Sequence, residues 1–197
     1  VQQDPWLQQG TIKDNILYGK NYQKEWYNKV VTACALKEDF AQLSKGDLTD
    51  VGERGVALSG GQKARVALAR AVYQDKEIYL IDDIFSAIDL SVGSQIYHKT
   101  ILGLLKHKTR ILVTHHPRYL TAASKVIAME NGKTKHVGRP REVMSYMNVD
   151  DQVLQQRQGL SCPKMTTSFH STTSHNHPSN SPTPVNSPLS TSIKDDQ

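Results

Sequence analysis

Apolar residues recur at helical spacing in two segments of the first 147 positions. Residues 22–36 carry their apolar side chains on one stripe, which predicts an amphipathic helix. The members of that stripe are Trp26, Val30, Val31 and Cys34. Residues 64–73 are rich in Ala, Leu and Arg, so we expect a second helix, which the chain enters through Gly60 and Gly61.

Two short apolar runs predict parallel strands. Residues 77–82 form a run that ends in Asp82, and residues 109–114 form another that ends just before His115. Such runs are typical of strands that are buried on both faces and carry polar chemistry at their carboxyl ends. Because residues 91–105 between them have a helical pattern, we expect a parallel β-α-β crossover.

The region that follows predicts an antiparallel edge. Asn131-Gly132 is a strong hairpin signal and separates the two strand-like segments 125–130 and 133–137. A short helix is expected over residues 117–123, and a last helix over residues 140–147. Residues 1–147 therefore predict an α/β domain with an antiparallel edge.

The composition changes near Asp150. Residues 165–197 consist almost entirely of Ser, Thr, Pro, Asn and His, with few, scattered apolar side chains. Such a segment cannot bury enough apolar surface to offset the entropy lost on ordering. We expect residues 148–197 to form a disordered linker rich in Ser, Thr and Pro.

Composition and charge narrow the possible classes of protein. Of the 197 residues 38% are apolar, and no apolar run approaches the roughly 20 residues that span a bilayer. Cys34 and Cys162 have no metal-ligand spacing, which favours a reducing compartment. The net charge is +5, but Lys and Arg are interleaved with Asp and Glu, so we expect no nucleic-acid partner.

The most specific chemical feature is the segment 58–62, LSGGQ, at the start of the second predicted helix. Ser59, Gly60 and Gly61 would present a hydroxyl and unpaired backbone N–H groups at the positive end of the helix dipole. That combination suits a phosphate. From these five residues alone, a glycine-rich turn that merely enters a helix is an equally good interpretation.

Four segments in order resemble the nucleotide-binding domain of an ABC ATPase. They are LSGGQ, the strand IYLID, the loop SAID and the strand ILVTH. The resemblance implies part of a P-loop NTPase fold with a helical subdomain, and ATP and Mg²⁺ as cofactors. It covers residues 1–147, which would run from the glutamine loop at Gln3 to the last helix of the domain.

The chain is more narrowly similar to subfamily C, the multidrug resistance-associated proteins, and within them to the first nucleotide-binding domain. The similarity rests on residues 33–36, 46–53 and 69–73 and on the pair Asp82-Asp83. The compact segment 101–105 resembles one member of that subfamily more than its longer relatives. Residues 11–19 resemble the stretch of ABC exporters that faces the membrane domain.

The resemblance implies roles for four residues around the ATP site. Asp82 would hold Mg²⁺ through water, and Gln3 would sense the Mg²⁺ or the attacking water. His115 would reach the γ-phosphate. Asp83 stands where active ABC sites usually have a catalytic Glu, and its carboxylate is set back by roughly 1.5 Å because it lacks one methylene. We therefore expect slow hydrolysis at this site.

The signature segment is implied to act at a second ATP site. In the head-to-tail dimer of the family, Ser59, Gly60, Gly61 and Gln62 would cover the γ-phosphate of ATP held by a second nucleotide-binding domain of the same polypeptide. The further partners implied are transmembrane domains and an exported small molecule. The whole protein would be integral to a membrane, with this segment on the cytosolic face.

The phosphate loop GxxxxGK[ST], or Walker A motif, is absent from the sequence. Gly132-Lys133-Thr134 imitates its end, but Ile127 stands where the first glycine belongs, so we expect a hairpin turn there. The loop would lie before Val1, and we expect the chain by itself neither to bind ATP tightly nor to hydrolyse it.

Two functions remain open. The first is one half of the ATP motor of a subfamily C exporter, and the second is a nucleotide-gated regulatory module of a channel. Soluble ABC ATPases of DNA repair or translation are disfavoured by residues 11–19 and by the linker-like tail. The sequence does not reveal the substrate.

Overall fold

A computed structural model of the chain describes residues 1–52 and 58–147, and the predicted linker 148–197 lies outside them. Short helices form the first third. They are α1 (Ile12–Leu17), α2 (Lys24–Ala33), α3 (Lys37–Gln42) and the 3₁₀ turn η1 (Gly46–Leu48). The amphipathic helix predicted over residues 22–36 corresponds to α2, whose buried face includes Val30 and Val31.

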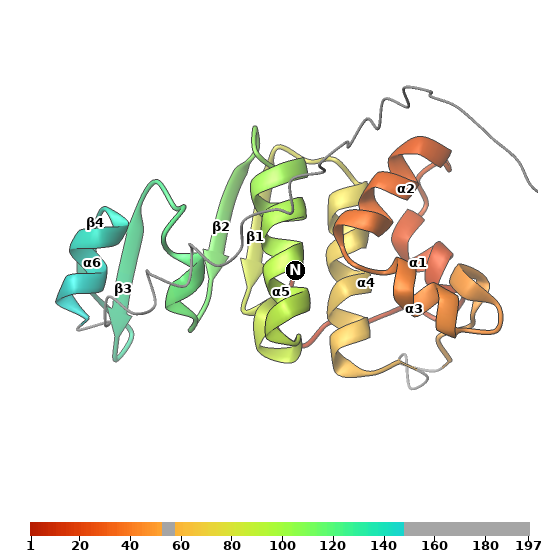
Figure 1. Ribbon diagram of the computed structural model, residues 1–197, viewed down its shortest axis with the longest axis horizontal. Helices are drawn as coiled ribbons and strands as arrows, with labels where there is room; N and C mark the ends of the chain where they lie inside the picture. Colours follow the sequence, from red (N-terminus) through yellow and green to blue (C-terminus); the bar gives the residue numbers. More distant parts are fainter. Residues whose placement is uncertain (53–57, 148–197) are drawn as a thin grey trace, which may run out of the picture. The chain divides into compact units, whose positions relative to one another are not determined.

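Helix α4 (Gly60–Tyr73) is the longest regular element described, and Figure 1 shows it between α1 to α3 and the strands. Its buried residues lie around much of its circumference, because α1 and α2 pack on one side and the segment after β1 on the other. We expected the helix to follow the two glycines. Instead both lie in its first turn, because Ser59 caps the helix one residue earlier.

The predicted parallel crossover is confirmed. Strands β1 (Ile78–Asp82) and β2 (Thr109–Val113) pair in parallel, with Asp82 opposite Val113. Between them lie the turn η3 (Ile84–Ala87), the helix α5 (Leu90–Ile96) and the π-helical turns η4 (Tyr97–Leu104) that continue it. The carboxyl ends of both strands therefore meet at one edge of the sheet.

The expectation that these strands are buried on both faces is wrong within the described residues. Tyr79 and Ile81 pack into the helical core, whereas the alternate residues face away from it and are exposed. The exposed residues are Ile78, Leu80, Ile111 and Val113. An unbroken apolar run does not reveal how many layers cover a strand, because that depends on elements elsewhere in the chain.

The backbone of Val1 adds to the free edge of β1. Its nitrogen donates to Leu80 O at 2.6 Å, and its carbonyl oxygen accepts the N–H of Asp82 at 2.9 Å. Contacts to the residues on both sides of Ile81 are the pattern of a parallel bridge. This bridge brings the start of the chain to the carboxyl end of β1.

The antiparallel hairpin is also confirmed. Strands β3 (Val126–Glu130) and β4 (Lys133–Gly138) are joined by Asn131 and Gly132, which both have positive φ as a type I′ turn requires. The 3₁₀ turn η5 (Pro117–Tyr119) precedes the hairpin and helix α6 (Pro140–Tyr146) follows it. The sequence Gly132-Lys133-Thr134 therefore belongs to a hairpin, as expected, with Gly132 in the turn and the other two residues in β4.

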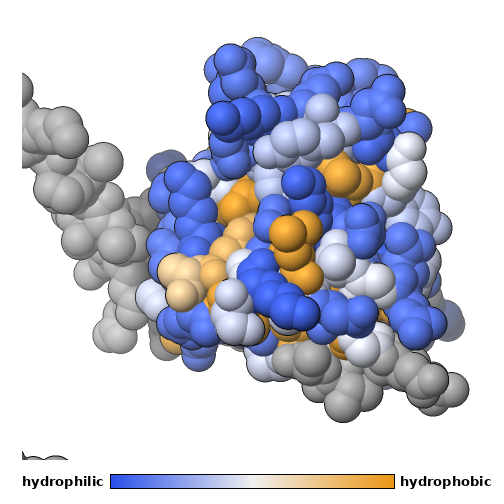
Figure 2. All heavy atoms as spheres, turned by 90° about the vertical axis from the view of Figure 1, so that its right-hand side faces the viewer, coloured by the Kyte–Doolittle hydropathy of each residue, from blue (hydrophilic) through white to orange (hydrophobic). Residues whose placement is uncertain are grey.

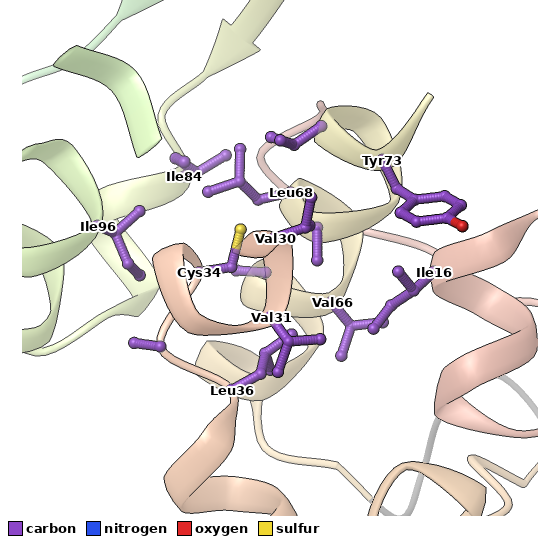
Figure 3. Close-up of a cluster of buried hydrophobic side chains, with 14 of the residues drawn as sticks. Ile16, Val30, Val31, Cys34, Leu36, Val66, Leu68, Tyr73, Ile84 and Ile96 are labelled. Atoms are coloured by element: carbon purple, nitrogen blue, oxygen red, sulfur yellow. The ribbon is translucent and has the colours of Figure 1, made fainter. Parts of the chain in front are cut away.

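One cluster of buried side chains joins the helices to the sheet (Figure 3). Leu68 on α4 and Cys34 after α2 are fully buried, and Ile84 and Ile96 contribute from the crossover. Figure 2 shows the side of α1 to α3, whose surface is mainly hydrophilic with small separate apolar groups. Within residues 1–52 and 58–147 no helix is long and apolar enough to cross a membrane.

Candidate functional site

Asp83 is positioned by the carboxyl end of β1. Its backbone N–H donates to Val113 O at 3.0 Å, which ties it to the end of β2. Its φ is 42°, in the left-handed region that Asp and Asn tolerate better than most residues. This turn folds the carboxylate inward, so that Asp83 is only 3% exposed although the preceding residue, Asp82, is exposed.

Two residues predicted from the sequence converge at this carboxylate. Gln3 Nε2 donates to Asp83 Oδ2 at 3.2 Å, and His115 Nε2 lies 3.8 Å from the same oxygen. Gln3 arrives through the bridge made by Val1, and His115 arrives at the end of β2. Parallel pairing of β1 and β2 therefore gathers residues that are far apart in the sequence. The His115 side chain is 83% exposed, so it can also meet a ligand from solvent.

The other oxygen of Asp83 lacks a hydrogen-bond partner among the described residues. Oδ1 is buried, and a buried carboxylate oxygen without a donor or cation is costly. Asp82, the preceding residue, is exposed at the same strand end. Carboxylate oxygens are the protein ligands that Mg²⁺ prefers, and Mg²⁺ needs only one or two of them because it keeps several waters. The residues present therefore fit a magnesium ion.

The LSGGQ segment forms a closed N-terminal cap on α4. Gln62 N donates to Ser59 Oγ at 3.2 Å, and Ser59 N donates to Gln62 Oε1 at 2.9 Å. The Ser59 hydroxyl acts as acceptor within the cap, so its hydrogen is left to donate to an anion. The surroundings of Gly60 are open, whereas Gly61 lies close to the backbone of Ala87. The cap thus presents Ser59 and Gly60 outward.

Sequence reasoning missed the partner of Gln62. Gln62 Nε2 donates to Asp39 Oδ1 at 3.0 Å, so its amide is engaged within the chain. The same Asp39 carboxylate pairs with Arg65, whose Nη2 lies 2.7 Å from Oδ1. Asp39 follows another acidic residue, Glu38, in a short helix, and nothing in the local pattern distinguishes the two. Only the packing of α3 against the start of α4 selects Asp39.

A second missed feature is an aromatic pocket beside α4. The pocket has a volume of about 350 Å³, and its lining includes Trp6, Tyr18, Arg70 and Gln74. The Arg70 guanidinium lies 4.4 Å from the Trp6 ring centroid and 5.4 Å from that of Tyr18. Its Nη2 donates to Trp6 O at 2.7 Å, whereas Nη1 is buried without a partner among the described residues. Burial lowers the pKa of Arg70, and a guanidinium nevertheless keeps its charge.

Comparison with known proteins points to one family. Residues 1–86 match the family model described as ABC transporter. The chain is 51% identical to the ATP-binding cassette sub-family C member 10 of Homo sapiens over 142 residues, which are 72% of this chain and 10% of that protein.

Two further relatives agree. Identity to the human sub-family C member 4 is 51% over 144 residues, covering 73% of this chain and 11% of that protein. The putative ABC transporter C family member 15 of Arabidopsis thaliana is 47% identical over 156 residues, which are 79% of this chain and 15% of that protein. The chain thus spans only 10–15% of the lengths of these relatives. It belongs to the ABC transporters of subfamily C, and its described residues form part of an ATP-binding domain of that family.

Proposed function

We propose that this chain forms part of the ATP motor of a subfamily C exporter, which couples ATP binding and hydrolysis to the export of small molecules. The observation that carries the proposal is the convergence of Gln3 and His115 on the buried carboxylate of Asp83. A glutamine, a carboxylate and a histidine at the carboxyl ends of parallel strands suit phosphoryl transfer, which depends on positioning and electrostatics.

Each residue has a separate part in the proposed site. Asp82 holds Mg²⁺ through water, and the ion neutralises phosphate charge when it is bound. Gln3 orients the Asp83 carboxylate through its amide, and Asp83 accepts a proton from the attacking water. His115 donates a hydrogen bond to the γ-phosphate from its exposed position at the end of β2.

Hydrolysis at this site is proposed to be slow. The Asp83 side chain is one methylene shorter than the Glu usual in the family, and it is turned inward toward Gln3. A general base must lie within hydrogen-bond reach of its water. General-base catalysis contributes about 10² to 10⁴-fold to the rate, and a base that does not reach its water loses part of this contribution.

The test grafts residues 1–147 into the corresponding region of human sub-family C member 10, with the other ATP site inactivated. Asp83→Glu should raise single-site ATP turnover at least tenfold, and His115→Ala should abolish it. Asp82→Asn should raise the Mg²⁺ concentration needed for turnover. If Asp83→Glu leaves turnover unchanged, the explanation of slow hydrolysis is wrong.

The signature segment is proposed to complete a second ATP site. Ser59 and Gly60 face outward at the start of α4, and the half-buried Gly61 follows them. Backbone N–H groups and the helix dipole favour an anion there. The partner is a second nucleotide-binding domain that carries its own phosphate loop, arranged head to tail. Gln62 supports this surface from within, because its amide is bound to Asp39 and to Ser59.

The transmembrane domains are proposed to dock at the aromatic pocket. Trp6 and Tyr18 are about half exposed, so their rings are available to an arriving segment of a transmembrane domain. Gln2 and Pro5, on either side of Gln3 in the sequence, also line this pocket. Docking at the pocket is therefore expected to move Gln3 at the ATP site. In the graft, Tyr18→Ala should reduce transport while leaving ATP binding unchanged.

The same proposal covers the domain bounds, the location, the class of substrate and the subfamily member. Residues 1–147 are the nucleotide-binding part, and residues 148–197 are a linker toward a further membrane domain. The whole protein lies in a membrane with this part on the cytosolic side, and its substrate is anionic or amphipathic. We propose, from the compact segment 101–105, that the chain is most like the seventh multidrug resistance-associated protein; its identity is 51% to the members numbered 10 and 4 alike.

One observation favours a second function. A short, inward-turned Asp83 suits a site that binds ATP without turning it over, as in a nucleotide-gated regulatory module of a subfamily C channel. Uptake of anionic conjugates into vesicles would support the exporter. A nucleotide-dependent conductance without uptake would support the regulatory module instead.

A further inference from the structure

Asp39 joins helix α3 to the start of helix α4. It lies in the first turn of α3, and both of its oxygens accept hydrogen bonds from the first turns of α4. Oδ1 accepts from Gln62 Nε2 at 3.0 Å and from Arg65 Nη2 at 2.7 Å. Oδ2 accepts from Arg65 Nη2 at 2.7 Å and from Arg65 Nε at 3.2 Å. The Asp39 and Arg65 side chains are only 13% and 12% exposed.

These contacts determine which way the Gln62 amide points. An amide group has a donor end and an acceptor end, and the two are nearly the same shape. Here the NH₂ end meets the Asp39 carboxylate and the oxygen meets the N–H of Ser59. In the reversed orientation the oxygen would face a carboxylate and the NH₂ group would face an N–H. Both contacts would then be repulsive, so Asp39 makes one orientation strongly preferred.

The orientation of Gln62 in turn determines what the signature segment presents. With Ser59 N satisfied by Gln62 Oε1 and Ser59 Oγ accepting from Gln62 N, the serine has one fixed rotamer. Its hydroxyl hydrogen is then left to donate to a group outside the cap. Without Asp39 the amide can rotate, and the cap that orients Ser59 loosens.

We propose that Asp39 is a positioning residue for the signature motif, which acts on Ser59 through Gln62. Arg65 has a supporting part, because its guanidinium neutralises the carboxylate and donates hydrogen bonds to both of its oxygens. Only one part of this inference rests on the proposed function, namely the effect of Asp39 on the second ATP site. The link from Asp39 to Gln62 to Ser59 can be tested without any nucleotide.

The first experiment is NMR of the full chain with labelled glutamine side chains. In the wild-type chain, the chemical shifts of the Gln62 NH₂ protons should differ from those of free side-chain amides, and these protons should exchange slowly with solvent. In Asp39→Ala they should move to the positions of free side-chain amides, while Glu38→Ala should leave them in place. Glu38 is the matched control, because it is the neighbouring carboxylate in the same turn and is exposed. Unchanged Gln62 signals in Asp39→Ala would overturn the proposal.

Asp39→Asn covers the possibility that Asp39→Ala fails to fold. Asn is nearly the same shape as Asp but has one acceptor oxygen for which Gln62 and Arg65 must compete. The Gln62 signals should then move part of the way in the same direction. If they stay at their wild-type positions, Asp39 does not orient the amide.

The second experiment measures ATP-dependent association of the full chain with a nucleotide-binding domain that carries a phosphate loop. Asp39→Ala should weaken this association about tenfold, as expected when a charge-assisted hydrogen bond is lost. Glu38→Ala should change it less than twofold. In a Gln62→Ala background, Asp39→Ala should have no further effect, because its action passes through Gln62.

The two experiments separate two kinds of failure. If the wild-type chain shows no ATP-dependent association while the Gln62 signals respond to Asp39→Ala, the proposed function fails and the positioning link stands. If Asp39→Ala weakens association equally with and without Gln62, Asp39 has only a general structural role and the inference is wrong.

Discussion

Gly61 lies against the backbone carbonyl of Ala87, so close that a Cβ added to Gly61 would stand 2.8 Å from that oxygen. Gly61 belongs to the signature segment, and Ala87 belongs to the SAID loop that follows Asp83. The start of α4 and the turn η3 therefore meet at this glycine. The contact gives the second signature glycine a structural role within its own domain, besides the one proposed for it at a phosphate.

Replacing Gly61 should cost stability, whereas replacing Gly60 should not. Gly61→Ala forces backbone to move and should lower the free energy of unfolding by about 1 to 3 kcal/mol. Gly60 has open space at its Cβ position, so Gly60→Ala should raise it by about 0.5 to 1 kcal/mol through better helix propensity. Urea unfolding of the two variants gives the comparison. Equal midpoints would contradict the close approach to Ala87.

Asp83→Asn should stabilise the fold while removing the proposed base. The substitution removes a buried charge whose Oδ1 has no partner among the described residues, and Asn tolerates the left-handed backbone. We expect a gain of about 1 kcal/mol in the free energy of unfolding. Asp82→Asn, at the exposed neighbour, is the control and should change stability by less than about 0.5 kcal/mol. A loss of stability in Asp83→Asn would show that the carboxylate is favourably solvated.

Cys34 should be unreactive in the folded chain. It is fully buried, and burial raises the pKa of its thiol to about 12 from 9.0. Because the thiolate is the reacting form, alkylation at pH 8 in a Cys162→Ser variant should be about 10³-fold slower in the folded chain than in urea. Rapid alkylation under native conditions would show that the core around α2 opens.

The same pKa shift predicts how stability depends on pH. The folded-state pKa of Cys34 lies above the unfolded value of 9.0, so folding favours the protonated thiol. Its contribution is fully present below pH 9 and is lost as the pH rises toward 12. Thermal unfolding between pH 8 and 11 should show a decline that is smaller in Cys34→Ala. An equal decline in both chains would assign it to other groups.

Asn15 should be among the most sensitive polar positions. It is fully buried, accepts the N–H of Gln8 at 2.9 Å, and donates to the carbonyls of Gln8 and Thr11, both at 3.0 Å. Asn15→Ala removes the side-chain partner of the N–H and of the carbonyl of Gln8, whereas the Thr11 carbonyl keeps the backbone N–H of residue 15. The substitution should cost about 2 to 4 kcal/mol of stability. Asn28→Ala, on the exposed side of α2, should cost little. Similar losses in both would contradict the buried network.

Most of the regular elements follow from local pattern in the sequence. Asn131 and Gly132 predict the hairpin because both residues tolerate the positive φ that a tight turn needs. The run ending at Asp82 and the run ending before His115 predict the parallel pair, and the helical pattern between them predicts the crossover. These predictions succeed because backbone preference and side-chain period act over a few residues.

Positions that depend on packing could not be predicted in the same way. The start of α4 was expected after Gly61, but the cap at Ser59 draws both glycines into the first turn. Strand β1 was expected to be buried on both faces, yet Ile78 and Leu80 are exposed in the described part of the chain. In each case the outcome depends on contacts that the local pattern does not contain.

The sequence by itself identified Gln3, Asp83 and His115 as candidates, through their motifs and their order along the chain. Only the tertiary structure decided that they converge, that one oxygen of Asp83 is left unpaired, and that Asp39 rather than Glu38 holds Gln62. The reason is geometric. Hydrogen bonds and burial act over a few ångströms between residues that lie tens of positions apart, and the paired strands and packed helices create those distances.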